Sequence, residues 1–478
     1  MAARPNILVF LTDDHGQWAA NCYGAAEIRS PNLDRLAATG VRMTRAFTPS
    51  PVCSPARASF FTGRFPSQHG IHDWLDETGT ASAPDLSGQT TIAELMQQGG
   101  YETALVGKWH CGGSRHRQPG FDHWFSYWAD QYPHFGAQQF SAQGRRVTAY
   151  GHQATSFTDR VIEFLRGRDT GKPFFLLVGY VNTHSPWSGQ PERLVAHYRD
   201  CSFSDVPRED AWSRHPGTVL PIPDDPADFR AQLSQYYAGV TMIDEQIGRI
   251  VDELESRGQL ADTLTIYTAD HGHMCGHQGL FGKGNATTPQ NLFDDSILVP
   301  CMLSWPRRLP RGRVCDAMVD HCDLFATVLD AAGVTPEAEV LAQINSPGRS
   351  CLRMLAGETT AWRDSQCCEY GNARMIRTDQ YKLVRRYPSA EARCDDELYD
   401  LQDDPRETVN RIHDGELAEI LGTLSQRLDD FFLAYEIPDR SGKRIDEQPV
   451  CNNDMVWARR PDDIAKLRER LKRTWREK

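Results

Sequence analysis

The 478-residue sequence lacks a long apolar segment, and most of its cations are dispersed along the chain. No stretch reaches the roughly 20 apolar residues that a membrane-spanning helix needs. The net charge of −12 argues against nucleic acid as a main partner, because phosphate backbones are bound by clustered cations. The Lys- and Arg-rich run 466–478 also contains acidic residues, so we expect a solvated helix face there. The sequence therefore predicts neither a membrane nor a nucleic-acid partner.

A secretion signal and a disulfide framework are also missing from the sequence. The first residues lead from Arg4 and Pro5 directly into the apolar run 7–11, which is typical of a core strand rather than of a leader. We therefore expect a cytoplasmic protein. The 13 cysteines are odd in number, scattered, and show no zinc-finger spacing, so we expect reduced thiols.

Up to about Gly333, short apolar runs alternate with helical patterns. Strands are predicted at about 6–11, 102–106, 174–181 and 263–268. Helices are predicted after Ser30-Pro31 and at about 91–98, 159–166, 227–257 and 323–332. This alternation is typical of an α/β fold with a large, mainly parallel sheet flanked by helices.

The pattern changes in the last third of the chain. Short strand candidates at 374–378, 381–386 and 397–401 indicate an antiparallel sheet, and a helix is predicted at about 415–434. Pro, Gly and polar residues gather at 336–348 and indicate a boundary there. We therefore expect a catalytic domain at 1–340 and a smaller α+β C-terminal subdomain at 341–478.

Residues that bind metals or move protons follow four of the predicted strands. Ligands of open α/β sheets bind beyond the carboxyl ends of the strands. Adjacent carboxylates repel each other there unless a cation neutralises them, and carboxylate oxygens suit calcium or magnesium. The residues at these ends are Asp13 and Asp14, then Lys108 and His110, then His184, then Asp270 and His271.

A second feature is the segment 53–57, which reads Cys-Ser-Pro-Ala-Arg. Ser54 and Pro55 are a favourable N-cap and first-turn pair, so Cys53 is expected just before a helix that runs to about Thr62. The free N–H groups and dipole of a helix N-terminus favour an anion. Arg57 in the first turn can add a bidentate contact to an oxyanion.

The segment 53–57 resembles the C-x-P-x-R signature of the type I sulfatase family. Similar segments extend over nearly the whole chain, at 5–14, 30–36, 107–110, 270–272, 282–284, 397–401 and 404–405. The resemblance implies a fold similar to that of alkaline phosphatase, with a small C-terminal subdomain that carries an antiparallel sheet.

The resemblance also implies a cofactor and a maturation partner. Cys53 would be converted to formylglycine by a separate formylglycine-generating enzyme, and one hydroxyl of its metal-bound hydrate would attack sulfur. The implied metal shell is Asp13, Asp14, Cys53, Asp270 and His271. Many relatives have Asn where this chain has His271, and imidazole is a softer donor than an amide oxygen. Calcium is expected first, and the softer donor at His271 leaves magnesium and manganese open.

The remaining roles implied by the resemblance concern charge and proton transfer. Arg57 and Lys108 resemble residues that hold the formylglycine, and His110 resembles the base of the second step. His184 and Lys283 resemble the pair that binds the ester oxygens and protonates the leaving group.

These features predict a hydrolase of sulfate monoesters that acts by S–O cleavage on a small sulfated substrate. A sulfated sugar, an aryl sulfate and an alkyl sulfate all stay open, and so does a homo-oligomer. One alternative is a phosphonate monoester or phosphodiester hydrolase, since such relatives share C-x-P-x-R and the metal shell. The other is a catalytically silent binder of sulfated ligands with an unmodified Cys53.

Three groups of residues have no assigned role at this point. The first group is an aromatic stretch that could stack on a sugar or aryl group or could serve in packing. It comprises Trp124, Tyr127, Trp128, Tyr132 and His134. His277 and Asn285 are candidates for lining the pocket. Asn452, Asn453 and Trp457 are candidates for closing the site or for contacting a second copy.

Overall fold

The computed structural model describes residues 4–76, 83–128, 134–206, 217–358, 361–390, 395–460 and 462–467. Its largest unit is a ten-stranded sheet in the order β13-β2-β12-β9-β1-β8-β4-β5-β6-β7. The middle strands β9, β1, β8, β4 and β5 are parallel to one another. The strand β12 and the edge strands β6 and β7 are antiparallel to their neighbours. The bounds are β1 Asn6–Thr12, β2 Val41–Met43, β4 Glu102–Gly107, β5 His123–Tyr127, β6 Phe135–Ala142, β7 Arg145–His152, β8 Phe174–Gly179, β9 Thr263–Ala269, β12 Cys301–Ser304 and β13 Arg313–Cys315.

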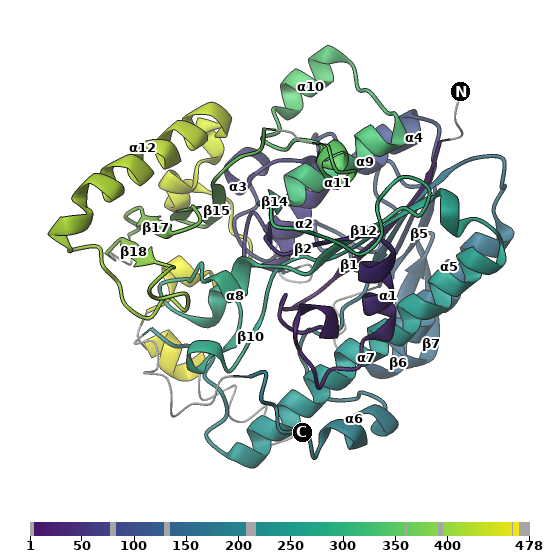
Figure 1. The fold of residues 1–478 in the computed structure, drawn as a ribbon, viewed down its shortest axis with the longest axis horizontal. Helices are drawn as coiled ribbons and strands as arrows, with labels where there is room; N and C mark the ends of the chain where they lie inside the picture. Colours follow the sequence, from purple (N-terminus) through teal and green to yellow (C-terminus); the bar gives the residue numbers. More distant parts are fainter. Residues whose placement is uncertain are drawn as a thin grey trace.

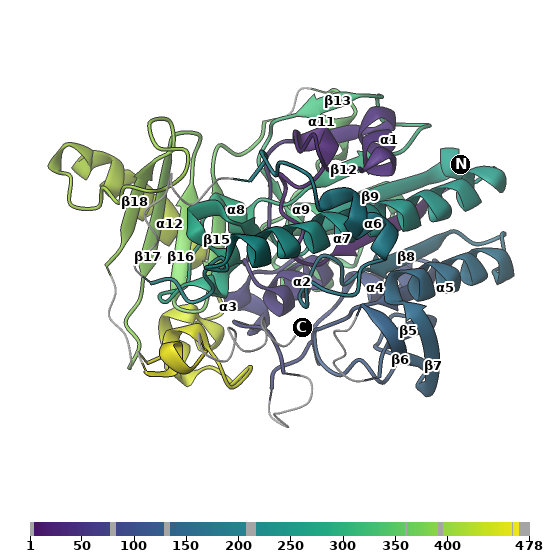
Figure 2. The same cartoon turned by 90° about the horizontal axis from the view of Figure 1, so that it is seen from below.

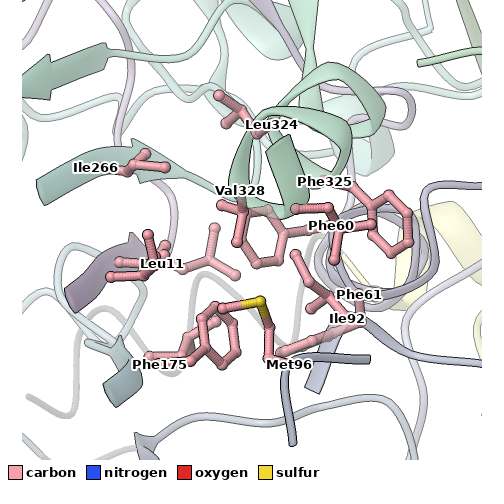
Figure 3. Close-up of a cluster of buried hydrophobic side chains, with 14 of the residues drawn as sticks. Leu11, Phe60, Phe61, Ile92, Met96, Phe175, Ile266, Leu324, Phe325 and Val328 are labelled. Atoms are coloured by element: carbon pink, nitrogen blue, oxygen red, sulfur yellow. The ribbon is translucent and has the colours of Figure 1, made fainter. Parts of the chain in front are cut away.

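The central strands are apolar on both faces because helices cover both sides of the sheet. Leu11, Phe175 and Ile266 point from three strands toward Phe60 and Val328 on the helices of one face (Figure 3). Leu8 and Phe10 of β1 point to the other face. The alternation along β1 therefore divides the core into two layers.

One face is covered by α2 (Cys53–Thr62), α4 (Ile92–Gln98) and α9 (His321–Ala332), and the other by α1 (Pro31–Thr39), α5 (Gln153–Gly167), α6 (Glu192–Tyr198) and α7 (Pro226–Ser256). Figure 1 shows α4 and α9 on one side of the strands and α5 and α7 on the other. The α1 helix begins with Pro31 at its first position, as the sequence indicated, and the α4 helix is capped by the Thr91 side chain.

A second sheet is an antiparallel meander of β15 (Gln366–Tyr370), β16 (Ala373–Arg377), β17 (Tyr381–Arg386) and β18 (Glu397–Asp400). The helix α12 (Ala418–Tyr435) packs on β16 and β17. Figure 2 shows this unit gathered at one end of the molecule. The fold class expected from the sequence is thus confirmed, while the boundary near 336–348 stays a prediction.

Short elements complete the described chain. They are β3 (Ala46–Phe47), α3 (Pro66–His69), β10 (Met274–Cys275), β11 (Phe281–Gly282), α8 (Asp294–Ile297), β14 (Val319–Asp320), α10 (Ala338–Ile344) and α11 (Leu352–Leu355). Single 3-10 turns occur at Asn21–Tyr23, Leu260–Asp262, His277–Gly279, Gly284–Ala286, Gly415–Leu417, Pro438–Arg440, Gly442–Glu447 and Val456–Ala458.

Two details differ from the sequence expectations. The α2 helix begins at Cys53 with Val52 as its N-cap, so the prediction that Ser54 caps it is wrong. Ser54 Oγ instead accepts a hydrogen bond from Leu75 N at 2.9 Å. The α5 helix begins at Gln153 rather than near 159, because the His152 side chain accepts from Ala154 N and caps it. In the part of the chain that the structure describes, no helix is both long and apolar enough to cross a bilayer.

Candidate active site

Three carboxylates lie just beyond two neighbouring parallel strands. Asp13 and Asp14 follow β1, and Asp270 follows β9, whose last residues pair with those of β1. Asp270 N donates to Thr12 O at 2.9 Å, which fixes the two strand ends side by side. Asp14 has a φ of +55°, in the left-handed region that few non-glycine residues occupy. Such strained positions are concentrated at functional sites.

Cys53 is the first residue of α2, a helix with every residue buried. The first turn of a helix has free N–H groups and the positive end of the dipole, so an anion is favoured there. Cys53 Sγ lies 3.4 Å from Asp13 Oδ1 and 3.3 Å from His271 Nε2. The helix therefore brings the cysteine to the carboxylates of the strand ends.

Two cations, Arg57 and Lys108, bind the carboxylates at the strand ends. Arg57, one turn into α2 and completely buried, donates from Nε to Asp270 Oδ2 at 2.9 Å. Lys108 Nζ lies 2.5 Å from Asp13 Oδ2. Lys108 is aligned by a close approach of two strands: Gly107 has a φ of +117°, and a Cβ there would lie 2.2 Å from Gly179 O. Only glycine fits, and Lys108 N then donates to Gly179 O at 2.8 Å.

Lys283 approaches the cysteine from the opposite side. Its Nζ lies 2.6 Å from Asp14 Oδ1, 3.0 Å from Cys53 Sγ and 3.2 Å from His271 Nε2. His271 Nδ1 is 2.9 Å from Gly272 O, so Nδ1–H donates to that carbonyl and Nε2 is left for the site. Side chains from the ends of β1 and β9, from α2 and from the loop that carries Lys283 thus lie close to the Cys53 sulfur.

Two further histidines complete the group. His110 has a φ of +58° and donates from Nε2 to Leu75 O at 3.0 Å, while its Nδ1 makes no hydrogen bond to any described residue. His184 Nδ1 lies 2.7 Å from Ser185 O, and a His184 nitrogen lies within 4.8 Å of ligand atoms of Asp13, Asp14 and Cys53. All ten residues singled out in the sequence therefore lie at one edge of the sheet.

The buried charges shift the pKa values of this group. Burial raises the pKa of the Cys53 thiol, but Lys108, Lys283 and His271 outweigh burial and hold the pKa well below its usual value. Burial and the charge of Asp13 raise the pKa of Asp270 to about 6. Burial lowers the pKa of His271, yet Asp270 raises it to about 9. The site therefore favours an anion at position 53.

The donor set fits a hard divalent cation. Ligand atoms of Asp13, Cys53, Asp270 and His271 lie within 4.8 Å of one another, and Asp14 belongs to an overlapping group with Asp13, Cys53 and His184. Three carboxylates at this spacing repel one another, and oxygen donors suit calcium and magnesium. The imidazole of His271 adds a nitrogen donor, which manganese also accepts.

A cavity of about 1080 Å³ opens above the cysteine. Its floor is formed by Asp14, Cys53, His110, His184 and Lys283. Its outer wall includes Trp74, Trp187, Arg199, Asp228, Arg230, Gln232, Phe281 and Asn285. The volume is far larger than a sulfate group needs and is typical of pockets for ring-sized ligands.

The aromatic stretch left open by the sequence packs elsewhere. Trp124 is buried against Trp109 and Phe121, and Trp128 contacts Arg115 and Arg146 at the surface. Tyr127 is buried as well, and Tyr132 lies outside the described residues. Packing is thus the correct interpretation for the described tryptophans and Tyr127.

The other open residues divide between the wall and the core. Asn285 lines the cavity, whereas His277 packs against Trp18. Asn452 Nδ2 donates to the carbonyl of the wall residue Trp74 at 2.7 Å. Asn453 is exposed. Trp457 packs on Tyr370 beneath the wall.

One buried cavity residue was missed in the sequence. His273 is 1% exposed, its Nδ1 lies 3.7 Å from Asp14 Oδ2, and neither ring nitrogen makes a hydrogen bond to a described residue. It stacks on Tyr236, and burial lowers its pKa to about 3. Its place three residues after Asp270, just beyond a strand end, is the signal that indicates it.

Comparisons with known proteins agree over most of the chain. Residues 5–334 match the family described as Sulfatase, and residues 289–432 match the family described as N-sulphoglucosamine sulphohydrolase, C-terminal. An N-acetylglucosamine-6-O-sulfatase of Bacteroides thetaiotaomicron is 27% identical, over 92% of this chain and 88% of the relative.

Two solved structures are also similar. One is a protein in complex with its substrate D-glucosamine-2-N,6-O-disulfate, with a TM-score of 0.78 and 25% identity over 91% of this chain and 98% of the other. The second is the phosphonate monoester hydrolase of Agrobacterium radiobacter, with a TM-score of 0.71 and 22% identity over 94% and 100%. The second likeness is one of fold alone.

Proposed function

The chain belongs to the sulfatase family and is a sulfuric ester hydrolase, and we propose that its nucleophile is the formylglycine that a maturation enzyme makes from Cys53. The position of Cys53 carries this proposal: its Sγ lies at the N-terminus of a buried helix, 3.0 Å from Lys283 Nζ and 3.4 Å from Asp13 Oδ1. A plain thiol is a poor choice for this reaction, because a sulfated thiol has no simple way to release sulfate.

The two groups that the family adds supply the covalent chemistry. Formylglycine, as its hydrate, would supply the two hydroxyls that attack on sulfur and release of sulfate require. Asp13, Asp14, Asp270 and His271 would hold a divalent metal, with calcium preferred, and that metal would supply Lewis-acid polarisation of the reacting oxygens.

The chain's own cations hold and neutralise the transferred group. Lys283 Nζ, 3.0 Å from the position of the nucleophile, is placed to bind a sulfuryl oxygen. Arg57 and Lys108 contact Asp13 and keep that carboxylate ionised, and the charge of Lys108 also favours an anion at residue 53. Such preorganised charges stabilise a transition state without moving during the reaction.

Two histidines are suited to proton transfer. Because His184 donates from Nδ1 to Ser185 O, its Nε2 is the nitrogen that would protonate the departing oxygen. Burial lowers the pKa of His184, but Asp14 and Asp13 outweigh burial and raise it, which favours a protonated acid. His110 donates from Nε2 to Leu75 O, so its Nδ1 is the atom that would accept a proton from residue 53.

A sulfated sugar is the substrate class that the cavity favours. The outer wall combines aromatic faces with polar side chains, and stacking plus hydrogen bonds is how a sugar ring is recognised. The names of the similar proteins, an N-acetylglucosamine-6-O-sulfatase and a complex with a disulfated glucosamine, support the same class.

A comparison of matured wild-type protein with Cys53→Ala tests the proposal. The substrates are a 6-O-sulfated glucosamine, an aryl sulfate, and phosphonate and phosphodiester esters with the same leaving groups. We expect kcat/KM for the best sulfate ester to exceed that for matched phosphorus esters by roughly tenfold or more. Cys53→Ala should lose about 10⁴-fold or more in turnover, because it removes the nucleophile.

Each rival has its own outcome in this experiment. Comparable sulfate release by Cys53→Ala would overturn the nucleophile. A preference for phosphonates would show that the protein is a phosphonate monoester hydrolase. An intact mass that retains the thiol after co-production with the maturation enzyme, together with tight binding and no turnover, would identify a silent binder.

A further inference from the structure

His134 lies directly behind the loop that carries His184. It is 2% exposed, and its Nε2 lies 2.8 Å from the main-chain oxygen of His184. It immediately precedes β6, in the aromatic stretch that the sequence left without a role. Among the described residues, His134 is not part of the cavity lining, whereas His184 is.

A one-way chain of hydrogen bonds determines the tautomer of His134. Tyr127 Oη donates to Gln153 Oε1, and Gln153 Nε2 donates to His134 Nδ1 at 2.7 Å. With Nδ1 as an acceptor, Nε2 carries the proton and donates to His184 O. Burial, reinforced by the neighbouring His152, lowers the pKa of His134 to about 3, so the ring stays neutral.

A second contact from the same hairpin holds the start of this loop. His152 Nε2 lies 3.1 Å from Gln190 Oε1, and Asn182 Nδ2 donates to the same oxygen at 3.1 Å. His152 Nδ1 accepts from Ala154 N, so His152 Nε2 is the donor to Gln190. The base of the β6–β7 hairpin therefore binds residue 184 directly and is linked to residue 182 through the Gln190 side chain.

The opposite side of the loop is fixed to the carboxylate strand. Thr183 N donates to Asp13 O at 2.7 Å, and Thr183 Oγ1 donates to Asp14 O at 2.6 Å. The loop is thus held between the metal-binding end of β1 and the hairpin at the sheet edge. Loss of the His134 contact releases the carbonyl of residue 184, whereas Thr183 stays fixed and His184 N still donates to Val181 O at 2.8 Å.

We propose that His134 is a positioning residue for His184: by holding the carbonyl of residue 184, it aims Nε2 of that histidine at the leaving oxygen of the substrate. The inference rests on the proposed function, because it assigns an effect on the acid of that reaction. Two links produce the aim. His134 fixes the peptide of His184, and Ser185 O fixes the ring through Nδ1. Proton donation depends on such geometry over distances of a few tenths of an ångström.

A purely structural histidine would behave differently from a positioning one. His134 also stacks on His152, with ring centroids 6.1 Å apart, so its loss affects packing as well. A loss of folded protein lowers turnover of all substrates by one factor. A misaimed acid instead slows esters with poor leaving groups, because activated aryl oxygens depart without a proton.

The test compares His134→Leu with His134→Gln on a sugar sulfate and on an activated aryl sulfate. The Leu side chain fills space but cannot donate to His184 O, whereas the Gln amide can both accept from Gln153 and donate to that oxygen. We expect His134→Leu to lose about tenfold in kcat for the sugar sulfate and less than about threefold for the aryl sulfate. His134→Gln should recover most of the difference. His123→Leu, an exposed histidine on β5, is the matched control and should leave both rates unchanged.

A double-variant cycle gives the second readout. If His134 acts through His184, His134→Leu added to His184→Ala should cause no further loss on the sugar sulfate. A full additional tenfold loss would overturn the inference, and so would equal losses on the two leaving groups.

Failure of the proposed function has a separate signature. If matured wild-type protein turns over no sulfate ester, the ring resonances of ¹⁵N-labelled His184 still report on the contact. His134→Leu should shift them and His134→Gln should shift them less. Unchanged His184 resonances in His134→Leu would overturn the positioning role whatever reaction the protein performs.

Discussion

The floor and the outer wall of the cavity are built from different kinds of residues. The floor, with the charges beneath it, is almost fully buried, and each carboxylate contacts a cation at 2.5–2.9 Å. In the outer wall, Arg199, Asp228 and Arg230 are exposed. Among its contacts with described residues, Arg230 donates to the carbonyls of Arg199 and Cys201 and to no carboxylate.

From this difference we infer that the floor performs the chemistry and that the wall selects the substrate. Buried charges that are already aligned act strongly on a reacting group, because little solvent screens them. Exposed side chains on α6 and α7 adapt to a leaving group at small energetic cost. Substitutions in the floor should therefore reduce rates for all esters, and substitutions in the wall should separate one ester from another.

The largest effect is expected at Asp13 and Asp270, two of the residues that we propose hold the metal. Asp270→Asn and Asp13→Asn each remove one carboxylate charge from the donor set, so calcium affinity should fall by more than about 100-fold and turnover with it. Calorimetry on the apoprotein measures the affinity independently of activity. Chelation of the wild-type protein should also abolish turnover, and the better of calcium and manganese in restoring it identifies the metal.

Asp262→Asn is the matched control for this prediction. Asp262 lies at the opposite end of β9 from Asp270 and pairs with Arg307 at the surface. Its substitution should leave metal affinity unchanged. Unaltered affinity in both the Asp13 and the Asp270 variant would show that these carboxylates do not hold the metal.

A smaller and selective effect is expected in the outer wall. Trp74 lines the cavity and has its carbonyl held by Asn452. Loss of an aromatic contact with a sugar ring costs about 1 kcal/mol, so Trp74→Ala should raise KM for a sugar sulfate roughly five- to tenfold. Turnover of a small aryl sulfate should change by less than about twofold. Steady-state kinetics on the two substrates measure the difference.

Two variants control for packing effects of Trp74→Ala. Trp74→Phe keeps an aromatic face and should retain most of the affinity. Trp362→Ala removes a tryptophan that packs away from the cavity, beside Arg349 and Arg363, and should leave both KM values unchanged. Equal changes in KM for sugar and aryl esters would contradict a role of the wall in selection.

The floor could be predicted from the sequence because its residues follow strands. Runs such as 6–11 and 263–268 are apolar and unbroken, so Asp13 and Asp270 could be placed at strand ends without a structure. The C-x-P-x-R segment then added Cys53 and Arg57 at a helix N-terminus.

The wall could not be predicted in this way. Trp74 and Trp187 lie in loops with no periodic pattern. They line one cavity although they are about a hundred residues apart in the sequence. The β6–β7 hairpin was missed because its strands are largely exposed, so the sequence has no buried alternation to indicate them. The link from His134 to His184 depends on that hairpin and was equally hidden.

The smallest effect concerns the support beneath the wall. Asp73 is fully buried next to Trp74, accepts hydrogen bonds from Trp74 N and Tyr370 Oη at 2.8 and 2.9 Å, and has its pKa raised by burial to about 7. The unfolded carboxyl loses its proton near pH 4, whereas the folded one keeps it to about pH 7. Stability from this group is therefore present below pH 4 and is lost as the pH rises to about 7, because the folded state binds the extra proton in that range.

The Asp73→Asn variant is neutral at this position at every pH. Its free energy of unfolding should therefore rise relative to that of wild type by about 1–3 kcal/mol between pH 5 and pH 8. Thermal or urea unfolding of both proteins at each pH measures this difference, and other titrating groups cancel in it. A difference that does not change with pH would show that Asp73 is ionised throughout, and the wall would then rest on a buried charge paired within the protein.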